Sequence, residues 1–222
     1  MKLYFLSPLF LQKLIWIPTN IILRFLGRLE VRGLENLKGL EAPAIFACNH
    51  TSELDPFFVP ASLPFFSRFS PIFYTSRERD FYIYSSWRKH FYGGAFFKAW
   101  GSYPVYAGLH DYEKSLKHHT QIILDGGSVC IFPEGRTTKD GKIQPAKGGV
   151  GYLAYATDTP IVPVRIQGVY RFSLKDFLLR RRHLSVTYGK PMRVSSEPNT
   201  TLSLDDFKMY ANHVMDQVKV LG

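Results

Sequence analysis

The sequence predicts an α/β fold with a mixed, largely parallel central sheet flanked by helices, preceded by an N-terminal amphipathic helical segment. Two observations support this fold class. Short, continuous apolar runs alternate with amphipathic stretches along most of the chain, and residues 3–26 are strongly apolar. The length of 222 residues suits one domain with a proper core.

Apolar runs mark the strands of the predicted sheet. The run at residues 44–48 ends at Asn49 and His50, as expected of a buried strand that places polar residues at its carboxyl end. Sites in α/β folds are usually built at such ends. A glycine-punctuated stretch at residues 31–37 predicts a strand and a turn. The other predicted strands are residues 72–74, 103–106, 128–132, 161–164 and 184–188.

Two amphipathic stretches predict long helices. Residues 111–125 carry apolar side chains among charges and stop at Gly126 and Gly127, a plausible carboxyl-terminal stop. Residues 204–221 predict a closing helix, with Ser203 as its N-terminal cap.

The amino-terminal segment predicts a membrane anchor. Lys13 interrupts its apolar run, and Pro8 and Pro18 are expected to break any single helix, so no run reaches the roughly 18 residues of a spanning helix. We expect two short helices that meet near Pro18 and lie among anionic lipid headgroups. The predicted division is a membrane-binding anchor at 1–28 and a catalytic domain at 29–222. The alternative is a helical hairpin packed on the domain's own core.

Composition narrows the possible partners. The formal charge is +10, from 28 Lys and Arg against 18 Asp and Glu, which favours a polyanionic partner. No nucleic-acid-binding motif is present in the sequence, so we expect an anionic membrane surface or a phosphate-rich donor rather than nucleic acid. Three aromatic pairs also suggest membrane contact: Phe65-Phe66, Phe81-Tyr82 and Phe96-Phe97. Cys48 and Cys130 are predicted to be buried, reduced thiols.

A histidine stands five residues before an aspartate in the segment His50 to Asp55. On one straight helix the two side chains would be about 140° apart, so contact requires a bend, which Pro56 favours. An aspartate that accepts the Nδ1 proton of His50 leaves Nε2 as a base. The alternative is that Asp55 only caps a helix beginning near Pro56. The spacing alone leaves both open.

Two further segments carry candidate binding residues. In the first, Glu134 can accept from hydroxyls, Gly135 lets a ligand approach the backbone, and Arg136 can grip a phosphate or carboxylate. In the second, Lys147 stands beside two glycines at the start of a predicted helix, an arrangement suited to an anion. Alone, each also fits an ordinary turn.

In order along residues 30–192, these segments resemble the glycerophospholipid acyltransferase superfamily, which includes lysophosphatidate acyltransferase. The four matching blocks are Asn49-His50 with Asp55, Gly101 to Val105, Phe132 to Gly135, and Ile161 to Val164. The resemblance implies catalysis by His50 and Asp55. The implied reaction moves a fatty acyl group from acyl-CoA or acyl-carrier protein to a lysophospholipid hydroxyl, most simply that of 1-acylglycerol-3-phosphate. It implies a phospholipid-synthesis enzyme on the cytoplasmic face of a membrane, peripheral or monotopic.

No cofactor and no metal are expected, because the acyl thioester is a co-substrate and the sequence has no metal-ligand spacing. Two departures from the family pattern leave the acceptor open. Tyr106-Ala107-Gly108 follows Val105 where the family usually has an arginine, and Arg136 comes one residue earlier than usual. Arg136, Lys139 and Lys147 are the candidates to hold the acceptor phosphate. Otherwise the acceptor is another lyso-lipid, such as a lyso-aminolipid or glycolipid. The remote alternative is a non-catalytic basic membrane-surface module.

Overall fold

A computed structural model describes residues 2–76, 95–106, 109, 111–194 and 202–222. Its described strands form one sheet in the order β1-β7-β6-β2-β5-β3-β4. Every neighbouring pair is parallel except β6 with β7. The strands are β1 (Glu30–Arg32), β2 (Ile45–Cys48), β3 (Ile72–Ser76), β4 (Ser102–Pro104), β5 (Ser128–Ile131), β6 (Ile161–Gln167) and β7 (Ser185–Tyr188). The mixed, largely parallel sheet is therefore confirmed.

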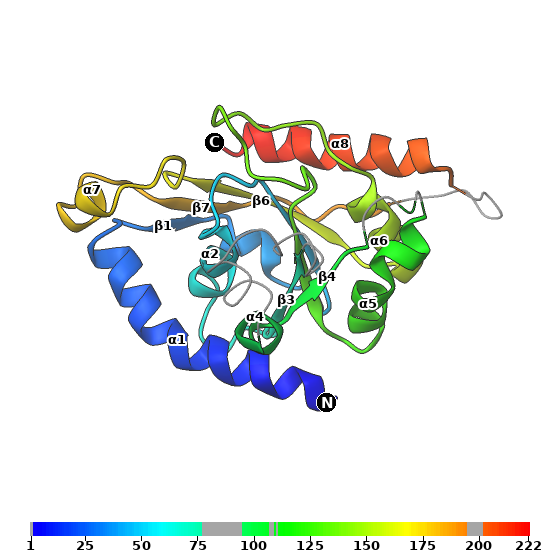
Figure 1. Ribbon diagram of the computed structural model, residues 1–222, viewed down its shortest axis with the longest axis horizontal. Helices are drawn as coiled ribbons and strands as arrows, with labels where there is room; N and C mark the ends of the chain where they lie inside the picture. The colour runs from blue at the N-terminus through cyan, green and yellow to red at the C-terminus, as the bar shows by residue number, and fades with distance from the viewer. Residues whose placement is uncertain (1, 77–94, 107–108, 110, 195–201) are drawn as a thin grey trace.

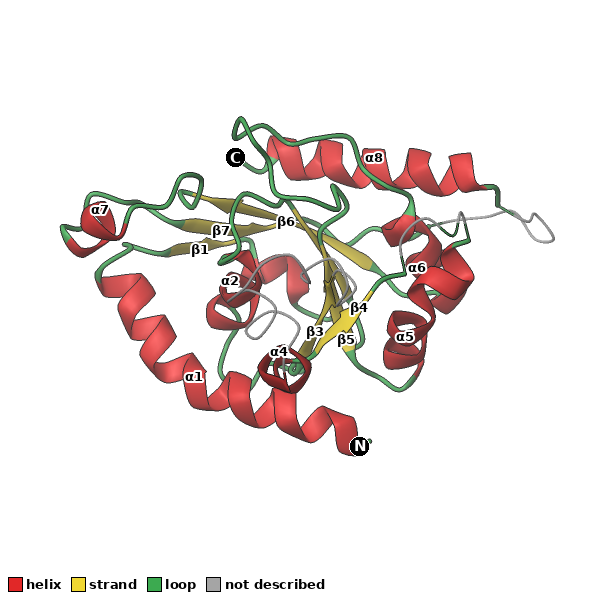
Figure 2. Cartoon of the chain, viewed as in Figure 1, coloured by secondary structure: helices red, strands yellow, loops and turns green. Residues whose placement is uncertain are grey.

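Helices cover both faces of this sheet (Figure 2). One face packs against α1 (Leu6–Phe25), α2 (Asp55–Ser62), α4 (Ala95–Trp100) and α7 (Leu174–Leu178). The other packs against α5 (Tyr112–Leu124), α6 (Gly149–Thr157) and α8 (Leu204–Val220). Two short 3-10 helices are η1 (Leu3–Phe5) and η2 (Leu34–Leu37).

The central strand β2 explains why the strands read as continuous apolar runs. Phe46 and Cys48 point to the layer of α2, whereas Ile45 and Ala47 point to the layer of α6 and α8, and all four are fully buried. A parallel strand covered on both faces needs apolar residues at every position. The Cys48 sulfur lies 3.5 Å from that of Cys130, and both are free, buried thiols as predicted.

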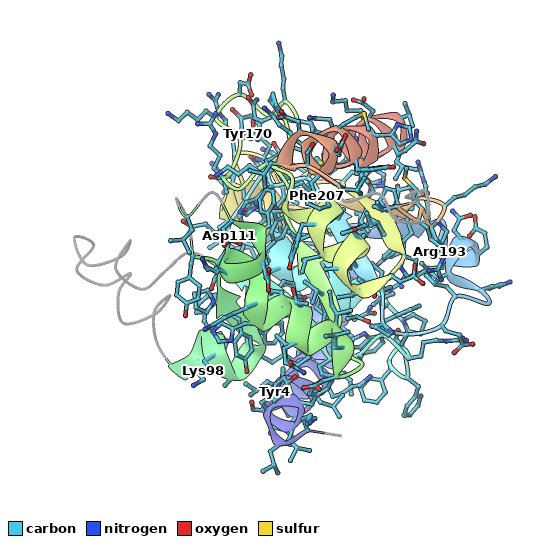
Figure 3. The ribbon with its side chains drawn as sticks, turned by 90° about the vertical axis from the view of Figure 1, so that its right-hand side faces the viewer. Tyr4, Lys98, Asp111, Tyr170, Arg193 and Phe207 are labelled. Carbon is cyan, nitrogen blue, oxygen red and sulfur yellow. The ribbon has the colours of Figure 1, made fainter. Side chains whose placement is uncertain are left out.

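The two predicted long helices are present. Helix α8 begins after Ser203, whose hydroxyl accepts from the backbone N–H of Asp206, while the Asp206 carboxylate accepts from the backbone N–H of Ser203. This reciprocal pair satisfies two otherwise unpaired donors at the start of the helix. Phe207, in the first turn, lies against α5 and α6 (Figure 3), with its ring centroid 5.6 Å from that of Tyr152.

The prediction of two short amino-terminal helices is wrong. Residues 6–25 form one helix, α1, with Pro18 inside it and Pro8 in its first turn. A proline in the first turn removes no helical hydrogen bond, whereas Pro18 removes one and destabilises the helix. Side-chain bonds to the protein flank Pro18: Trp16 donates to the Leu63 carbonyl and Asn20 to the Ala61 carbonyl. We attribute the continuity of α1 to this tertiary anchoring.

Helix α1 turns its amide side chains inward together with Leu11, Ile15 and Leu23, and leaves a second set of apolar side chains exposed. Gln12 is buried and donates to the carbonyl oxygens of Ile72 and Trp100 at 2.7 and 3.0 Å. The exposed residues recur at helical spacing and form what we call the α1 apolar face: Leu3, Leu6, Phe10, Leu14, Ile17, Ile21, Ile22 and Phe25. Their exposures range from 46% at Ile22 to 85% at Leu3, so most of this face is open to solvent in the protein. α1 runs along the lower left edge of the molecule (Figure 1).

The length and composition of residues 3–25 are sufficient to cross a membrane, and 11% of the 18-residue apolar window is buried in the protein. This differs from the sequence-based expectation, because the prolines do not interrupt the helix. Of the three aromatic pairs, Phe65-Phe66 and Phe96-Phe97 are described, and Phe66 is 91% exposed. The pair Phe81-Tyr82 lies outside the described residues.

The buried His119 on α5 predicts a pH-dependent stability. Its Nε2 lies 3.2 Å from the Tyr74 carbonyl oxygen, and burial lowers the pKa of His119 to about 4. The unfolded chain, with a histidine pKa near 6.5, therefore binds a proton between pH 6.5 and 4 that the folded protein does not. The contribution of His119 to stability is therefore fully present above pH 6.5. The free energy of unfolding falls by roughly 3 kcal/mol as the pH drops to 4.

His119→Gln should flatten this slope in urea unfolding measured across that pH range. Glutamine keeps a donor for the Tyr74 carbonyl but does not titrate. His213→Gln on α8 is the matched control, because it makes the same substitution at an exposed position. It should leave the slope as in the parent protein. If His119→Gln leaves the slope unchanged, His119 is not the source of the pH dependence.

Candidate active site

His50 follows the carboxyl end of β2, where the central strand leaves the sheet. The preceding Asn49 is buried and forms two hydrogen bonds with the backbone of Ile166 on β6: its Nδ2 donates to the carbonyl and its Oδ1 accepts from the N–H. The His50 ring stacks on Phe132 with centroids 4.2 Å apart and an interplanar angle of 22°. Its side chain is 19% exposed, so the ring is held by the protein but reachable from outside.

Asp55 is the hydrogen-bond partner of the imidazole. Its Oδ2 lies 2.9 Å from His50 Nδ1 and also accepts from the backbone N–H groups of Thr51 and Ser52, at 2.6 and 2.9 Å. The side chain is fully buried. An oxygen that accepts from two backbone donors is an acceptor for the histidine as well, so in the neutral imidazole Nδ1 carries the proton and Nε2 has the free lone pair.

The loop between the two residues supplies the bend that the spacing requires. Helix α2 begins at Asp55, and Leu54 at its N-cap position makes no side-chain capping bond. The Asp55 carboxylate accepts from amides that precede the helix, and not from those in its first turn. The structure thus favours the dyad arrangement over the simple helix cap.

Glu134 braces the histidine from the neighbouring strand end. Its Oε1 accepts from the His50 backbone N–H at 2.7 Å, and its Oε2 accepts from the Gln144 N–H at 2.8 Å. Burial raises the pKa of Glu134, and these two N–H groups, Gln144 first, partly offset the rise. The side chain is only 3% exposed. These two bonds show that Glu134 holds the His50 backbone, and the binding of substrate hydroxyls by the same carboxylate stays a prediction.

A second contact on the histidine backbone comes from Thr138, whose N–H donates to the His50 carbonyl at 2.8 Å. This hydrogen bond ties the loop after β5 to the loop after β2. Glu134 and Thr138 therefore hold the backbone of His50, while Asp55 holds its ring. The contacts of Phe132 and Thr138 with His50 carry no sequence signal of their own, since each depends on which strand ends become neighbours in the sheet.

Exposed cations follow Glu134 along the chain, in the segment that also holds the His50 backbone. Gly135 has a φ of 67°, and a Cβ there would lie 3.1 Å from the Lys147 Nζ, so glycine lets the lysine lie across this turn. Arg136, Lys139 and Lys147 are all exposed. Among the described residues no carboxylate forms an ion pair with these three, which leaves their charge available to an anionic ligand.

The second sequence block lies at the edge of the sheet. Gly101 has a φ of 99°, and β4 continues from it to Pro104. The Val105 N–H donates to the Ser76 carbonyl at 2.9 Å, so the chain leaves β4 beside the carboxyl end of β3. Ala107 and Gly108, part of the departure from the family pattern, lie outside the described residues.

Glu134→Gln is expected to weaken both the fold and the site. The new amide places an NH₂ group against one of the two backbone N–H donors, which leaves a buried donor unpaired and costs about 1–3 kcal/mol of unfolding free energy. A displaced histidine lowers kcat by up to about 100-fold with little change in KM. Thermal unfolding and steady-state kinetics measure the two effects, and the exposed Glu113→Gln on α5 is the matched control. Equal kcat values for the two variants would refute the positioning role.

Comparison with known proteins places these residues in a family. A family model described as Acyltransferase matches residues 28–167, which include His50, Asp55 and Glu134. A chloroplastic 1-acyl-sn-glycerol-3-phosphate acyltransferase of Brassica napus is 29% identical over 140 residues, which are 63% of this chain and 37% of that protein. A second chloroplastic enzyme of that name, from Arabidopsis thaliana, is 25% identical over 76% of this chain and 44% of its own length. The chain thus spans less than half the length of these relatives.

The fold also resembles a solved structure. The 1-acyl-sn-glycerophosphate acyltransferase PlsC of Thermotoga maritima superimposes with a TM-score of 0.57 over 95% of this chain and 81% of that one, at 18% sequence identity. At this identity the likeness concerns the fold alone. Because the family model covers more than half of the sequence and includes the His50 and Asp55 pair, the chain belongs to the acyltransferase family.

Proposed function

We propose that this chain is an O-acyltransferase that moves a fatty acyl group from an acyl thioester to the hydroxyl of 1-acylglycerol-3-phosphate. The observation that carries the proposal is the 2.9 Å contact between Asp55 Oδ2 and His50 Nδ1, in which the aspartate is fixed as an acceptor by two backbone amides. The pair leaves Nε2 of an accessible imidazole as a general base.

The proposed reaction is a single transfer without an acyl-enzyme. His50 Nε2 takes the proton of the acceptor hydroxyl, and the oxygen attacks the thioester carbonyl carbon. The C–O bond forms, the C–S bond breaks, and the imidazolium returns its proton to the leaving thiolate. Asp55 stabilises the imidazolium while it exists. The donor is acyl-CoA or acyl-carrier protein, used as a co-substrate, and the reaction requires no cofactor or metal.

The exposed cations support a phosphate-bearing acceptor. Arg136 can bind a phosphate with a planar pair of donors, and the exposed Lys139 and Lys147 add two point charges in the same part of the sequence. The relatives named above are 1-acyl-sn-glycerol-3-phosphate acyltransferases, which supports the same acceptor. The sequence Tyr106-Ala107-Gly108, where the family usually carries an arginine, favours a second candidate: a lyso-aminolipid or glycolipid acceptor.

We also propose that α1 binds the protein to the cytoplasmic face of an anionic membrane, as a peripheral or monotopic attachment. On its inner face, the side chains of Gln12, Trp16 and Asn20 donate hydrogen bonds to backbone carbonyls of the domain, so the helix lies along the domain. Its outer α1 apolar face then rests in the headgroup region, parallel to the bilayer.

A mass-spectrometric assay tests the chemistry and the acceptor together. Purified protein in detergent micelles is given a labelled acyl-CoA or acyl-carrier protein with lysophosphatidate, a lyso-aminolipid or a lyso-glycolipid. The proposal predicts acylated product with lysophosphatidate and the highest kcat/KM for that acceptor. Product with another lyso-lipid alone supports the second candidate, and absence of product in every combination refutes acyl transfer.

A further inference from the structure

A second apolar and basic surface lies at the far end of α1. Helix α7 and the residues after it, 174–181, form what we call the α7 turn. Leu174, Leu178 and Leu179 are 63%, 56% and 52% exposed, and only Phe177 of the helix is buried. Charged side chains lie among and after these leucines. Three are cations, Lys175, Arg180 and Arg181, and one is a carboxylate, Asp176.

The α7 turn is continuous with the α1 apolar face. The Arg180 guanidinium lies over the Phe25 ring, 4.6 Å from its centroid, and Phe25 is itself 60% exposed. Beneath them Gly27 packs so closely on Phe177 that a Cβ there would lie 2.9 Å from the Phe177 ring. The upper end of α1 and α7 meet at the left of the molecule, whereas α8 lies along its top (Figure 1), on the other face of the sheet.

Residues on either side of the α7 turn, Tyr170 and Arg182, are hydrogen-bonded toward the active site. Arg182 donates to the Tyr170 carbonyl at 3.2 Å, and the Tyr170 hydroxyl donates to the Lys139 carbonyl at 2.7 Å. Lys139 adjoins Thr138, whose N–H holds the His50 carbonyl. Tyr170 lies at the top of the molecule and Tyr4 of η1 at its foot (Figure 3). The chain that leaves the α7 turn is therefore hydrogen-bonded to the loop after β5, which also holds the His50 backbone.

We propose that the α7 turn is a second membrane-docking element, which inserts its leucines among the headgroups of an anionic bilayer and holds the active-site opening against it. This rests on the proposed membrane attachment of α1. Exposed leucines interleaved with cations suit the boundary between acyl chains and anionic headgroups. The α7 turn extends the contact beyond the end of α1 and so fixes the protein's orientation, whereas one helix alone leaves the domain free to rotate about the helix axis.

The test compares three double variants of the full chain in vesicle co-sedimentation. Leu178→Ser with Leu179→Ser removes the α7 contact, and Phe10→Ser with Leu14→Ser weakens the α1 contact. Leu204→Ser with Val220→Ser on α8 is the control, with side chains 48% and 74% exposed on the opposite side. With phosphatidylcholine vesicles containing phosphatidylglycerol, the α7 variant should partition at least about tenfold less than the parent protein, and the α8 control should match the parent.

Activity in detergent micelles separates this proposal from the proposed chemistry. The α7 variant should retain the parent's rate in micelles and lose rate only on vesicles. Vesicle partitioning equal to the parent's overturns the α7 proposal, as does an equal loss in the α8 control. A parent protein that is inactive in micelles refutes the acyl-transfer proposal instead, and the partitioning results then still decide whether the α7 turn docks.

Discussion

Replacing His50 by alanine is expected to lower the rate of acyl transfer by about 10²- to 10⁴-fold, because it removes the positioned base. The backbone of residue 50 keeps its partners, since Glu134 and Thr138 bind its N–H and carbonyl and not its side chain. The variant should therefore fold, bind vesicles and unfold close to the parent's temperature while losing activity. Single-turnover acyl transfer, followed by mass spectrometry, measures the chemical step.

The exposed His213→Ala on α8 is the matched control for this experiment and should keep the parent's rate. Retention of acyl transfer in His50→Ala would exclude His50 as the base. If vesicle binding then remained intact, the non-catalytic membrane-surface module would become the better description.

The second large effect is expected at Asp55, where two substitutions separate charge from geometry. In Asp55→Asn the side-chain oxygen should take the position of Oδ2, because the N–H groups of Thr51 and Ser52 require an acceptor there. That oxygen still accepts from His50 Nδ1 and preserves the tautomer. Only the charge that stabilises the imidazolium is lost, so kcat should fall by about 10- to 100-fold.

Asp55→Ala removes the acceptor as well as the charge. The His50 ring loses its orientation, and the amides of Thr51 and Ser52 lose a buried acceptor, which lowers the unfolding free energy by about 1–3 kcal/mol. We expect a loss of activity greater than in the asparagine variant, on the order of 10³-fold or more. Kinetics with thermal unfolding of both variants make the comparison. Equal activity losses in the two would show that the negative charge, and not the tautomer, is what Asp55 contributes.

The sheet was the most predictable part of the structure. Strands covered on both faces require apolar residues throughout, so β2, β5 and β6 were apparent as continuous runs. The Ser203 cap was also local, since a serine and the backbone of the first helical turn are enough to form it. Both signals come from residues that are close together in the chain.

The errors arose where distant residues decide the outcome. Pro18 was expected to end a helix, but Trp16 and Asn20 bind carbonyls more than 40 positions away and hold α1 together across it. The bond between Glu134 and the His50 backbone was out of reach for the same reason, since the local pattern shows only a polar residue at a strand end. Its partner, the His50 N–H, is 84 positions away and becomes a neighbour only because β2 and β5 pair in parallel.

The hydrogen bonds that hold His50 divide the site into two parts that can change independently. Asn49, Asp55 and Glu134 are buried and bind mainly backbone groups, so substitutions among them disturb the base whatever the acceptor. Arg136, Lys139 and Lys147 are exposed and brace none of these groups with their side chains. Under the proposed function, exchange of these surface cations changes the acceptor preference with little penalty in stability and leaves the buried bonds around His50 intact, so these three positions are the starting point for engineering lipid selectivity.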